Sequence, residues 1–413
     1  MPVYNTDPSA LRKAIESVQK QVHQNWELIC VDDCSTKKEP DEILREAAKD
    51  PRIKYLKLEK NSGISKATNH GASQASGEIL CFLDHDDELV PHALCTVAAR
   101  FSKNPQVNVV YSNHDKMDRL GKLSEPMIKG PWDPEWILTF NYTCHFFALR
   151  RALFNEIGGL RPEYDHAQDH DLILRLSETQ NARTIDSIDD VLYHWRMLPA
   201  STASGAQGAH TRNPHLKAIA DHLQRKGVAA TVTCHPIFSV YKIDFPAAQT
   251  QCTTFTISNA DDFRKLSTST SQLQNEDLLI LTRPGVLPLS DKDFQEMTSN
   301  LNRMEIGGFS PTILDQKNRV HYAGLFGDEI DTWTPRDRLW FDYELTRIHQ
   351  RSVRQLSPFC FGTKVGIWKK FSKVHTYPIE SLAQLAKVFS EYLEHDRLRK
   401  IWSPHSKFKL NHL

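Results

Sequence analysis

The sequence Gly77-Glu-Ile-Leu-Cys-Phe-Leu-Asp-His-Asp-Asp-Glu-Leu-Val-Pro91 contains the feature that decides the fold. Residues 79–83 form an unbroken apolar run, which is too short for a helix and is typical of a strand buried on both faces. Carboxylates follow it immediately, beginning at Asp84. In open α/β folds, ligands bind at the C-terminal ends of the parallel strands. The stretch therefore predicts an α/β protein with acidic side chains at its binding edge.

The acids that follow this strand are Asp84, Asp86 and Asp87, which lie within four positions of one another. Like charges at this spacing repel one another unless a cation lies between them. Carboxylate oxygens suit Mg²⁺ or Mn²⁺, and the phosphates of a substrate commonly complete the coordination shell. These acids predict a divalent-cation site. The alternative is a solvated acidic turn that caps the next helix.

Length and composition limit the possible classes of protein. A chain of 413 residues is long enough for two domains. Lysine plus arginine equals aspartate plus glutamate, at 51 each, so no net charge favours nucleic acid as a partner. No apolar run approaches the length of about 20 residues that spans a membrane, and no signal peptide is recognised. The eight scattered cysteines are typical of free thiols, which predicts a cytoplasmic protein.

The N-terminal half alternates between strand and helix patterns. Residues 26–31 predict a strand that ends at Asp32 and Asp33, which again places carboxylates at a strand end. Helices separate this strand from its neighbours, an arrangement that indicates a doubly wound parallel sheet. Further along, Asp169 and Asp171 lie at the start of an amphipathic helix. The helix dipole favours carboxylates at this position, and we expect both to face a cleft.

Six motifs occur in register over residues 1 to about 205, and together they closely resemble glycosyltransferase family 2. The motifs are Pro2-Val-Tyr-Asn, Val31-Asp-Asp33, Asn61-Ser-Gly63, Asp84-His-Asp86-Asp87, Gln168-Asp169 and Tyr193-His-Trp-Arg196. This resemblance implies a GT-A fold, a Rossmann-like α/β fold with a mixed, mostly parallel sheet flanked by helices. It also implies an enzyme that transfers a sugar from a nucleotide-diphospho-sugar with inversion.

The resemblance also implies roles for individual residues. Three residues would line the pocket for the nucleotide base: Pro2, Tyr4 and Asp33. Asp84 would lie beside the ribose. Asp86 would coordinate the metal, and His194 matches a position that is a further metal ligand in some relatives. Asp169 matches the catalytic base, and Asp171 would support the site. The chemistry agrees, because a metal neutralises the leaving diphosphate and one carboxylate can remove the proton of the acceptor hydroxyl.

Several of these side chains have a structural alternative. Asp33 could cap the turn that follows it, and Asp171 could serve the first turn of its helix. His194 could be a packed core histidine. Lys66 could meet a phosphate or stay solvated at a helix start. Arg196 could clamp the diphosphate or form a salt bridge.

Two departures from the family pattern stand out. Members of the family begin with an apolar strand before the Pro-x-Tyr-Asn motif, and here Met1 stands in its place. The second departure is the C-terminal part. Two domains are expected, at residues 1–230 and 235–413, and residues 277–288 in the second domain repeat the pattern of the acidic strand. In that repeat Asp84 falls on Thr282 and Asp86 falls on Pro284. The second domain is therefore predicted to be a smaller, degenerate glycosyltransferase-like α/β domain without metal ligands or base.

Three functions remain in competition. The leading hypothesis is a hexosyltransferase-type enzyme that elongates a bacterial surface glycan, such as a lipopolysaccharide O-chain or a capsule. Its acceptor would be a glycan or a lipid-linked glycan, and it would work in the cytoplasm with possible peripheral association at the inner face of the membrane. The second hypothesis is a catalytically silent scaffold or a sugar-nucleotide-binding remnant. The third, a nucleotidyltransferase, lacks the glycine-rich basic phosphate loop that it would need.

Overall fold

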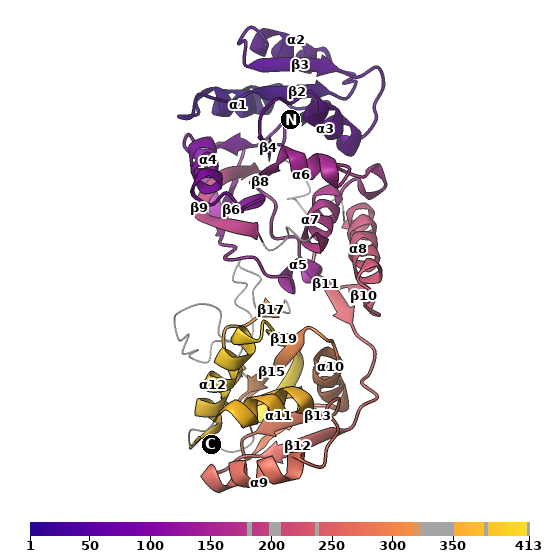
Figure 1. Ribbon diagram of the computed structural model, residues 1–413. Coiled ribbons are helices and arrows are strands. Elements are labelled where there is room, and N and C mark those ends of the chain that lie inside the picture. Colours follow the sequence, from indigo (N-terminus) through magenta and orange to yellow (C-terminus); the bar gives the residue numbers. More distant parts are fainter. Residues whose placement is uncertain are drawn as a thin grey trace. The chain divides into compact units, whose positions relative to one another are not determined.

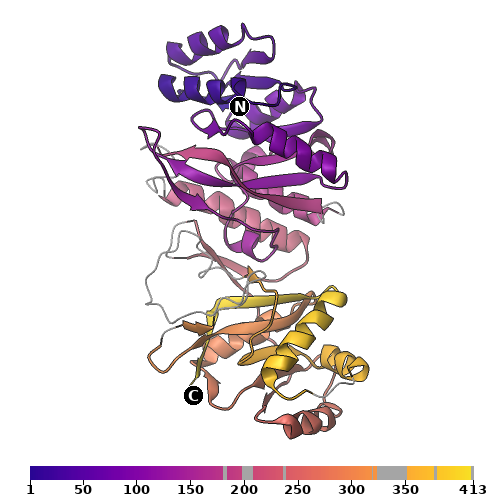
Figure 2. The same cartoon turned by 90° about the vertical axis from the view of Figure 1, so that its left-hand side faces the viewer.

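The computed structural model describes residues 1–179, 184–197, 208–235, 239–318, 320–322, 351–375 and 379–410. The chain divides into two compact units (Figure 1), which are also seen from the side (Figure 2). Unit 1 comprises residues 1–132, 140–228 and 232–241, and unit 2 comprises residues 133–139, 229–231 and 242–413. The short segment 133–139 belongs to unit 2, and the domain bounds expected from the sequence, 1–230 and 235–413, stay a prediction.

Unit 1 begins with a parallel sheet of three strands in the order β1-β2-β3. Its strands are β1 (Pro2–Val3), β2 (Leu28–Asp32) and β3 (Ile53–Lys57), and its helices are α1 (Pro8–Gln19), α2 (Lys38–Ala47) and α3 (Ile64–Ser73). Helix α1 begins sharply because the Asp7 carboxylate accepts the N–H groups of Ser9 and Ala10. All five residues of β2 are buried. The alternation of parallel strands and helices expected for this region is confirmed.

The second sheet of unit 1 has the order β4-β8-β6-β9-β5, with β7 beside β6. Its strands are β4 (Ile79–Phe82), β5 (Glu88–Leu89), β6 (Val109–Met117), β7 (Leu123–Met127), β8 (Phe147–Arg150) and β9 (Ile185–Arg196). Only β6 and β9 are parallel; the other pairs are antiparallel. The mixed α/β class is confirmed, but the expected parallel majority is confined to the first sheet. Strand β1 is only two residues long. Within unit 1, β1 and β4 belong to separate sheets.

The remaining elements of the N-terminal half are mostly helices. They are α4 (Ala93–Lys103), α5 (Trp136–Thr139), α6 (Arg151–Glu156), a 3-10 turn (Pro162–Tyr164), α7 (Gln168–Glu178) and α8 (Gly208–Arg225), followed by the paired strands β10 (Thr231–Cys234) and β11 (Tyr241–Asp244). Leu11 and Ile15 of α1 pack with Val97 and Phe101 of α4 in one buried apolar cluster. None of the helices in the described part of the chain combines the length and the apolar character needed to cross a membrane.

Unit 2 contains one mixed sheet in the order β12-β13-β18-β15-β19-β14, with β16 beside β15 and β17 beside β19. Its strands are β12 (Cys252–Thr256), β13 (Leu278–Thr282), β14 (Val286–Pro288), β15 (Ile306–Leu314), β16 (Val320–Tyr322), β17 (Arg351–Ser352), β18 (Cys360–Lys364) and β19 (Arg399–Leu410), and its main helices are α9 (Ala260–Thr270), α10 (Asp291–Leu301), α11 (Val365–Val374) and α12 (Leu382–His395). Within this unit the Glu135 carboxylate is buried and binds the guanidinium groups of Arg303 and Arg399.

The sheets of the two units share one topology. The path β4-β8-β6-β9-β5 corresponds to β13-β18-β15-β19-β14, and each pair along it has the same parallel or antiparallel sense. In unit 2, however, β12 pairs directly with β13 in parallel, and α9 alone connects them. Among its described residues, unit 2 therefore has no counterpart of β2 and β3.

Candidate functional site

The acidic loop between β4 and β5 converges with a histidine from the segment before β8. One ligand atom from each of Asp84, Asp87 and His145 can be chosen so that all three lie within 4.8 Å of one another. Two carboxylate oxygens and one imidazole nitrogen form a donor set that suits a divalent cation such as Mn²⁺. We call these three residues the acidic cluster of the site.

Burial shifts the pKa values of the acidic cluster toward the neutral forms of its side chains. Although 40% of the Asp84 side chain is accessible, loss of surrounding water and then the charge of Asp86 raise the pKa of Asp84 to about 6. Burial likewise raises the pKa of Asp87, and loss of water lowers the pKa of His145 to about 4. A neutral imidazole beside crowded carboxylates fits a cation, which would neutralise the acids and accept the nitrogen lone pair.

Arg196 and Tyr193, both on β9, hold the acidic loop in place. The Tyr193 hydroxyl donates to Asp87 Oδ2 over 2.6 Å, and the Arg196 backbone N–H donates to Asp87 Oδ1 over 2.7 Å. The buried Arg196 guanidinium donates to the Asp86 carbonyl over 2.7 Å and forms an ion pair with Glu88. The structure thus gives Arg196 a role in the loop. Its expected role at a diphosphate stays a prediction.

Asp86 and His194 lie outside the acidic cluster. Asp86 carries a side chain that is 21% accessible, and His85 Nδ1 lies 3.7 Å from its Oδ1. Its charge nevertheless raises the pKa of Asp84, so the two carboxylates are neighbours. His194 lies opposite Glu88 in the β5–β9 ladder, and its Nδ1 lies 2.6 Å from Asp115 Oδ1. The metal-ligand roles expected for Asp86 and His194 stay predictions.

Asp169 occupies the first turn of α7, as the sequence predicts. Its Oδ1 accepts the N–H of His170 over 2.9 Å, and its Oδ2 accepts the Asn141 amide over 3.0 Å. The negative charge of Asp169 contributes to the raised pKa of Asp84 and opposes the lowering at His145. The candidate base therefore lies close enough to the acidic cluster for its charge to act on the pKa values of Asp84 and His145. His170, the next residue in the sequence, is an alternative candidate for the base. Its side chain is buried, and its Nδ1 lies 2.9 Å from His215 Nδ1.

With this geometry established, comparison with known proteins identifies the family. The sequence model of the family described as Glycosyl transferase family 2 matches residues 1–158. Residues 1–158 belong to glycosyltransferase family 2. The match covers β1 to α6 and includes the acidic loop and His145, and it ends before Asp169.

Three curated relatives are partial matches. The O-antigen biosynthesis protein RfbC of Myxococcus xanthus is 37% identical over 251 residues, which are 60% of this chain and 20% of that protein. The uncharacterized protein y4gI of Sinorhizobium fredii is 35% identical over 64% of this chain and 30% of that protein. The putative colanic acid biosynthesis glycosyl transferase WcaA of Escherichia coli is 38% identical over 43% of this chain and 64% of that protein. The chain thus spans less than a third of the first two relatives.

Solved structures give weaker similarity. S. aureus TarS 1–349 in complex with UDP-GlcNAc aligns with a TM-score of 0.44 and 24% identity, over 54% of this chain and 64% of that one. GalNAc-T7 with UDP, GalNAc and Mn²⁺ aligns with a TM-score of 0.44 and 18% identity, over 54% and 46% of the two chains.

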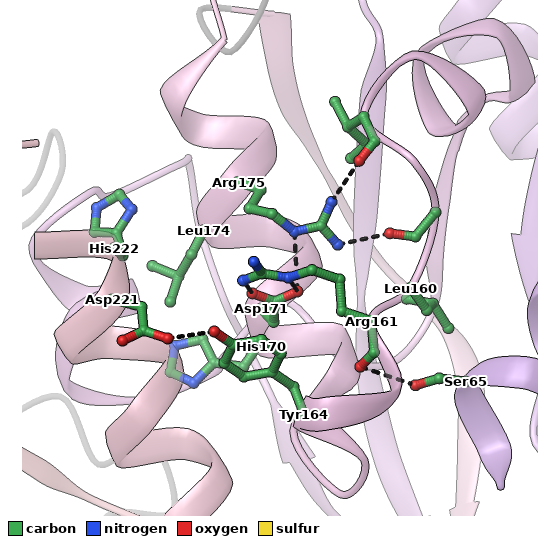
Figure 3. A network of polar contacts seen from close by, with 12 residues as sticks. Ser65, Leu160, Arg161, Tyr164, His170, Asp171, Leu174, Arg175, Asp221 and His222 are labelled. Carbon is green, nitrogen blue, oxygen red and sulfur yellow. Dashed lines mark hydrogen bonds and ion pairs between the residues drawn. The ribbon is translucent and has the colours of Figure 1, made fainter. Parts of the chain in front are cut away.

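Asp171 is fully buried and binds two arginines (Figure 3). Its carboxylate forms ion pairs with Arg161 and with Arg175, whose Nε lies 2.9 Å from Asp171 Oδ2. Arg175 also donates to the carbonyls of Ile157 and Gly159 over 2.9 and 2.6 Å. These contacts make Asp171 the anchor of the segment that precedes α7. Support of the site, the role expected from the resemblance, is compatible with this position and stays a prediction.

The residues expected at the nucleotide lie on the first sheet and its helix. Asp33 accepts the N–H groups of Ser62 and Gly63 over 2.7 and 2.9 Å, so its carboxylate shapes the Asn-Ser-Gly turn. Tyr4 follows the end of β1 and is 42% exposed, and Lys66 is exposed on α3. Pro2 pairs with Val31 in the β1–β2 ladder. Contact of these residues with a nucleotide stays a prediction.

Sequence reasoning missed the residues that complete the site. The sequence marks Asp87 as part of the acidic run but gives it no separate role. His145 and Asn141 lie in a segment whose pattern carries no recognisable motif, and their partners are distant in sequence: Asp84 for His145 and Asp169 for Asn141. They precede β8, and the start of β8 lies beside the C-terminal end of β4 because these two strands are antiparallel. That strand sense could not be predicted from the sequence.

Proposed function

We propose that unit 1 transfers a sugar from a nucleotide-diphospho-sugar to a glycan or lipid-linked glycan acceptor, with inversion, during synthesis of a bacterial surface polysaccharide. The observation that carries this proposal is the proximity of the acidic cluster to Asp169 on a helix of the same unit. Membership of family 2 supports the class of reaction. Relatives named for O-antigen and colanic acid biosynthesis support the class of product.

In the proposed mechanism each part of the site has one task. Asp84, Asp87 and His145, with Asp86 beside them, would hold a divalent cation, which supplies a Lewis acid for the diphosphate. The oxygen of the acceptor hydroxyl bonds to the anomeric carbon as the bond from that carbon to the diphosphate oxygen breaks. The electron pair leaves with the nucleoside diphosphate, and Asp169 accepts the hydroxyl proton. Attack opposite to the leaving group inverts the configuration without a covalent enzyme intermediate.

Unit 2 is proposed to be a degenerate copy of the same fold. The shared strand path supports a common architecture. The described residues of unit 2 contain no counterparts of β2 and β3, the region in which the nucleotide residues of unit 1 lie. Thr282 and Pro284 stand at the strand end where unit 1 has its acids, and the Thr282 hydroxyl donates to the Val286 carbonyl over 3.2 Å. We propose that donor chemistry belongs to unit 1 alone, and that the protein acts in the cytoplasm, at the inner face of the membrane when its acceptor is lipid-linked.

The test is donor turnover by the purified chain. A panel of uridine, thymidine and guanosine diphospho-sugars is incubated with Mn²⁺ or Mg²⁺, and release of the nucleoside diphosphate is followed with and without glycan acceptors. We expect turnover of at least one donor that is lost on adding EDTA and absent in Asp84→Asn. Tight donor binding without turnover would favour the alternative, a silent sugar-nucleotide-binding protein, for which the two-residue β1 is the motivating observation.

A further inference from the structure

The segment from Asn141 to His145 contacts both halves of the proposed site. At one end, the Asn141 amide donates to Asp169 Oδ2 over 3.0 Å. At the other end, the His145 ring belongs to the acidic cluster. We call residues 141–145 the bridging segment. Because only four peptide bonds separate its two functional ends, its conformation sets the position of the base carboxylate and of a cation ligand together.

The buried side chain of Lys129 contacts the backbone of the bridging segment. It is 1% exposed, and its ammonium group donates to the His145 carbonyl over 2.6 Å and lies 3.5 Å from the Thr143 carbonyl. Its backbone N–H donates to Asn113 Oδ1, which fixes the main chain at the same point. Within the described residues its ammonium group forms no ion pair with a carboxylate. Burying a lysine without a carboxylate partner costs free energy, and its bonds to these backbone carbonyls offset part of that cost.

The orientation of the Asn141 amide is set inside the bridging segment. The Thr143 hydroxyl donates to Asn141 Oδ1 over 3.0 Å, and both side chains are buried. Since Oδ1 accepts this bond, the opposite end of the amide, Nδ2, faces Asp169. His114 Nδ1 lies 3.2 Å from the His145 carbonyl and must be the donor there, because a carbonyl oxygen only accepts. The segment is thus fixed at both ends and in the middle.

We propose that Lys129, Asn141 and Thr143 are positioning residues for sugar transfer. Lys129 fixes the backbone of the bridging segment, Thr143 orients the Asn141 amide, and Asn141 aims the Asp169 carboxylate while His145 is held at the cation. Asn141 acts through the Asp169 carboxylate, and Lys129 and Thr143 act through the bridging segment. The inference rests on the proposed function for the identity of the reaction, and on hydrogen bonds within unit 1 for the positioning.

Two readouts separate the two ends of the segment in the full-length chain. Mn²⁺ affinity is measured by calorimetry, and kcat and KM are measured with the donor that the wild type turns over. Lys129→Met keeps the length of the side chain and removes its donors, and we expect it to lower both Mn²⁺ affinity and kcat about 10- to 100-fold, the usual effect of losing an outer partner. Asn141→Leu should lower kcat about 10- to 100-fold and leave Mn²⁺ affinity and donor KM unchanged.

Thr143 provides a matched pair that tests positioning against mere packing. Thr143→Val has the same shape but lacks the hydroxyl, so we expect it to lower kcat, whereas Thr143→Ser keeps the hydroxyl and should retain kcat within about threefold. Lys116→Met, a lysine of β6 in the same unit, is the control for Lys129→Met and should change neither readout. Full kcat and Mn²⁺ affinity in Lys129→Met and Asn141→Leu, or equal kcat in the two Thr143 variants, would overturn the proposal. Absence of any wild-type turnover would instead contradict the proposed function. The Mn²⁺ affinity of Lys129→Met, compared with that of the wild type, would still test the positioning role of Lys129.

Discussion

The phenolic hydroxyl of Tyr193 donates a 2.6 Å hydrogen bond to Asp87 Oδ2, and both side chains are buried. Burial by itself raises the pKa of Asp87, and this bond together with the Arg196 N–H acts against that rise. The Tyr193 hydroxyl therefore favours the charged form of a carboxyl group whose burial favours the neutral form. The bond also joins β9 to the loop after β4, which fixes the acidic cluster to the sheet.

Tyr193→Phe should weaken both the fold and cation binding. The substitution leaves a buried carboxyl oxygen without its donor, which costs about 1–3 kcal/mol of unfolding free energy. The pKa of Asp87 should rise further, so Mn²⁺ affinity at neutral pH should fall. Urea unfolding and calorimetry measure the two effects. Tyr4→Phe, at an exposed tyrosine of the same unit, is the control, and equal results for the two variants would contradict the assignment.

Asp84 predicts a pH dependence of opposite sign for folding and for cation binding. Its folded-state pKa of about 6 lies above the ordinary value of 3.8, so the folded metal-free protein binds this proton more tightly than the unfolded chain. The stabilisation is complete below about pH 3.8 and is lost as the pH rises through about 6. Mn²⁺ competes with the same proton, so its affinity should fall as the pH drops through about 6. In Asp84→Asn both pH dependences should shrink, and wild-type pH profiles in that variant would show that another group titrates instead.

Asp169→Asn should cut turnover by about 10²–10⁴-fold, the usual contribution of a general base. Because the substitution leaves the acidic cluster intact, donor KM and Mn²⁺ affinity should change little. Asp190→Asn, at an exposed carboxylate on β9, serves as the control and should keep full activity. The buried position of the His170 side chain argues against it as the base. If His170→Ala abolishes transfer in a folded protein and Asp169→Asn does not, the base is misassigned.

Local patterns in the sequence were enough to predict the elements of unit 1 that carry the acids. The apolar run at residues 79–83 became β4, and α7 begins at Gln168 as expected. Contacts between distant segments were not predictable in this way. Asn141, Lys129 and His145 act through hydrogen bonds and proximity created by the fold, and no spacing marks them. The antiparallel character of the second sheet was missed for the same reason, since strand sense depends on the path of the loops.

Asp171→Asn should destabilise unit 1 far more than its position beside the candidate base would suggest. Removing the charge leaves Arg161 and Arg175 without their buried partner, and breaking a buried ion pair in this way costs about 3–5 kcal/mol. Thermal or urea unfolding measures the loss. Glu16→Gln, which breaks the exposed pair with Lys20, should cost less than about 1 kcal/mol. A stable Asp171→Asn protein with impaired kcat would instead give this carboxylate a direct part in the reaction.

Unit 2 should bind no nucleotide sugar, and the test belongs in the full-length chain. A fragment that begins at residue 235 would lack residues 133–139, which belong to unit 2 and bring Glu135 to Arg303 and Arg399. The double substitution Asp84→Asn and Asp87→Asn, made in the intact chain, removes the carboxylates of the acidic cluster and leaves unit 2 unchanged. We expect Mn²⁺-dependent donor binding in calorimetry to disappear completely, because Thr282 and Pro284 offer no charged ligand. Residual Mn²⁺-dependent binding with a stoichiometry near one would place a working donor site in unit 2 and overturn its description as degenerate.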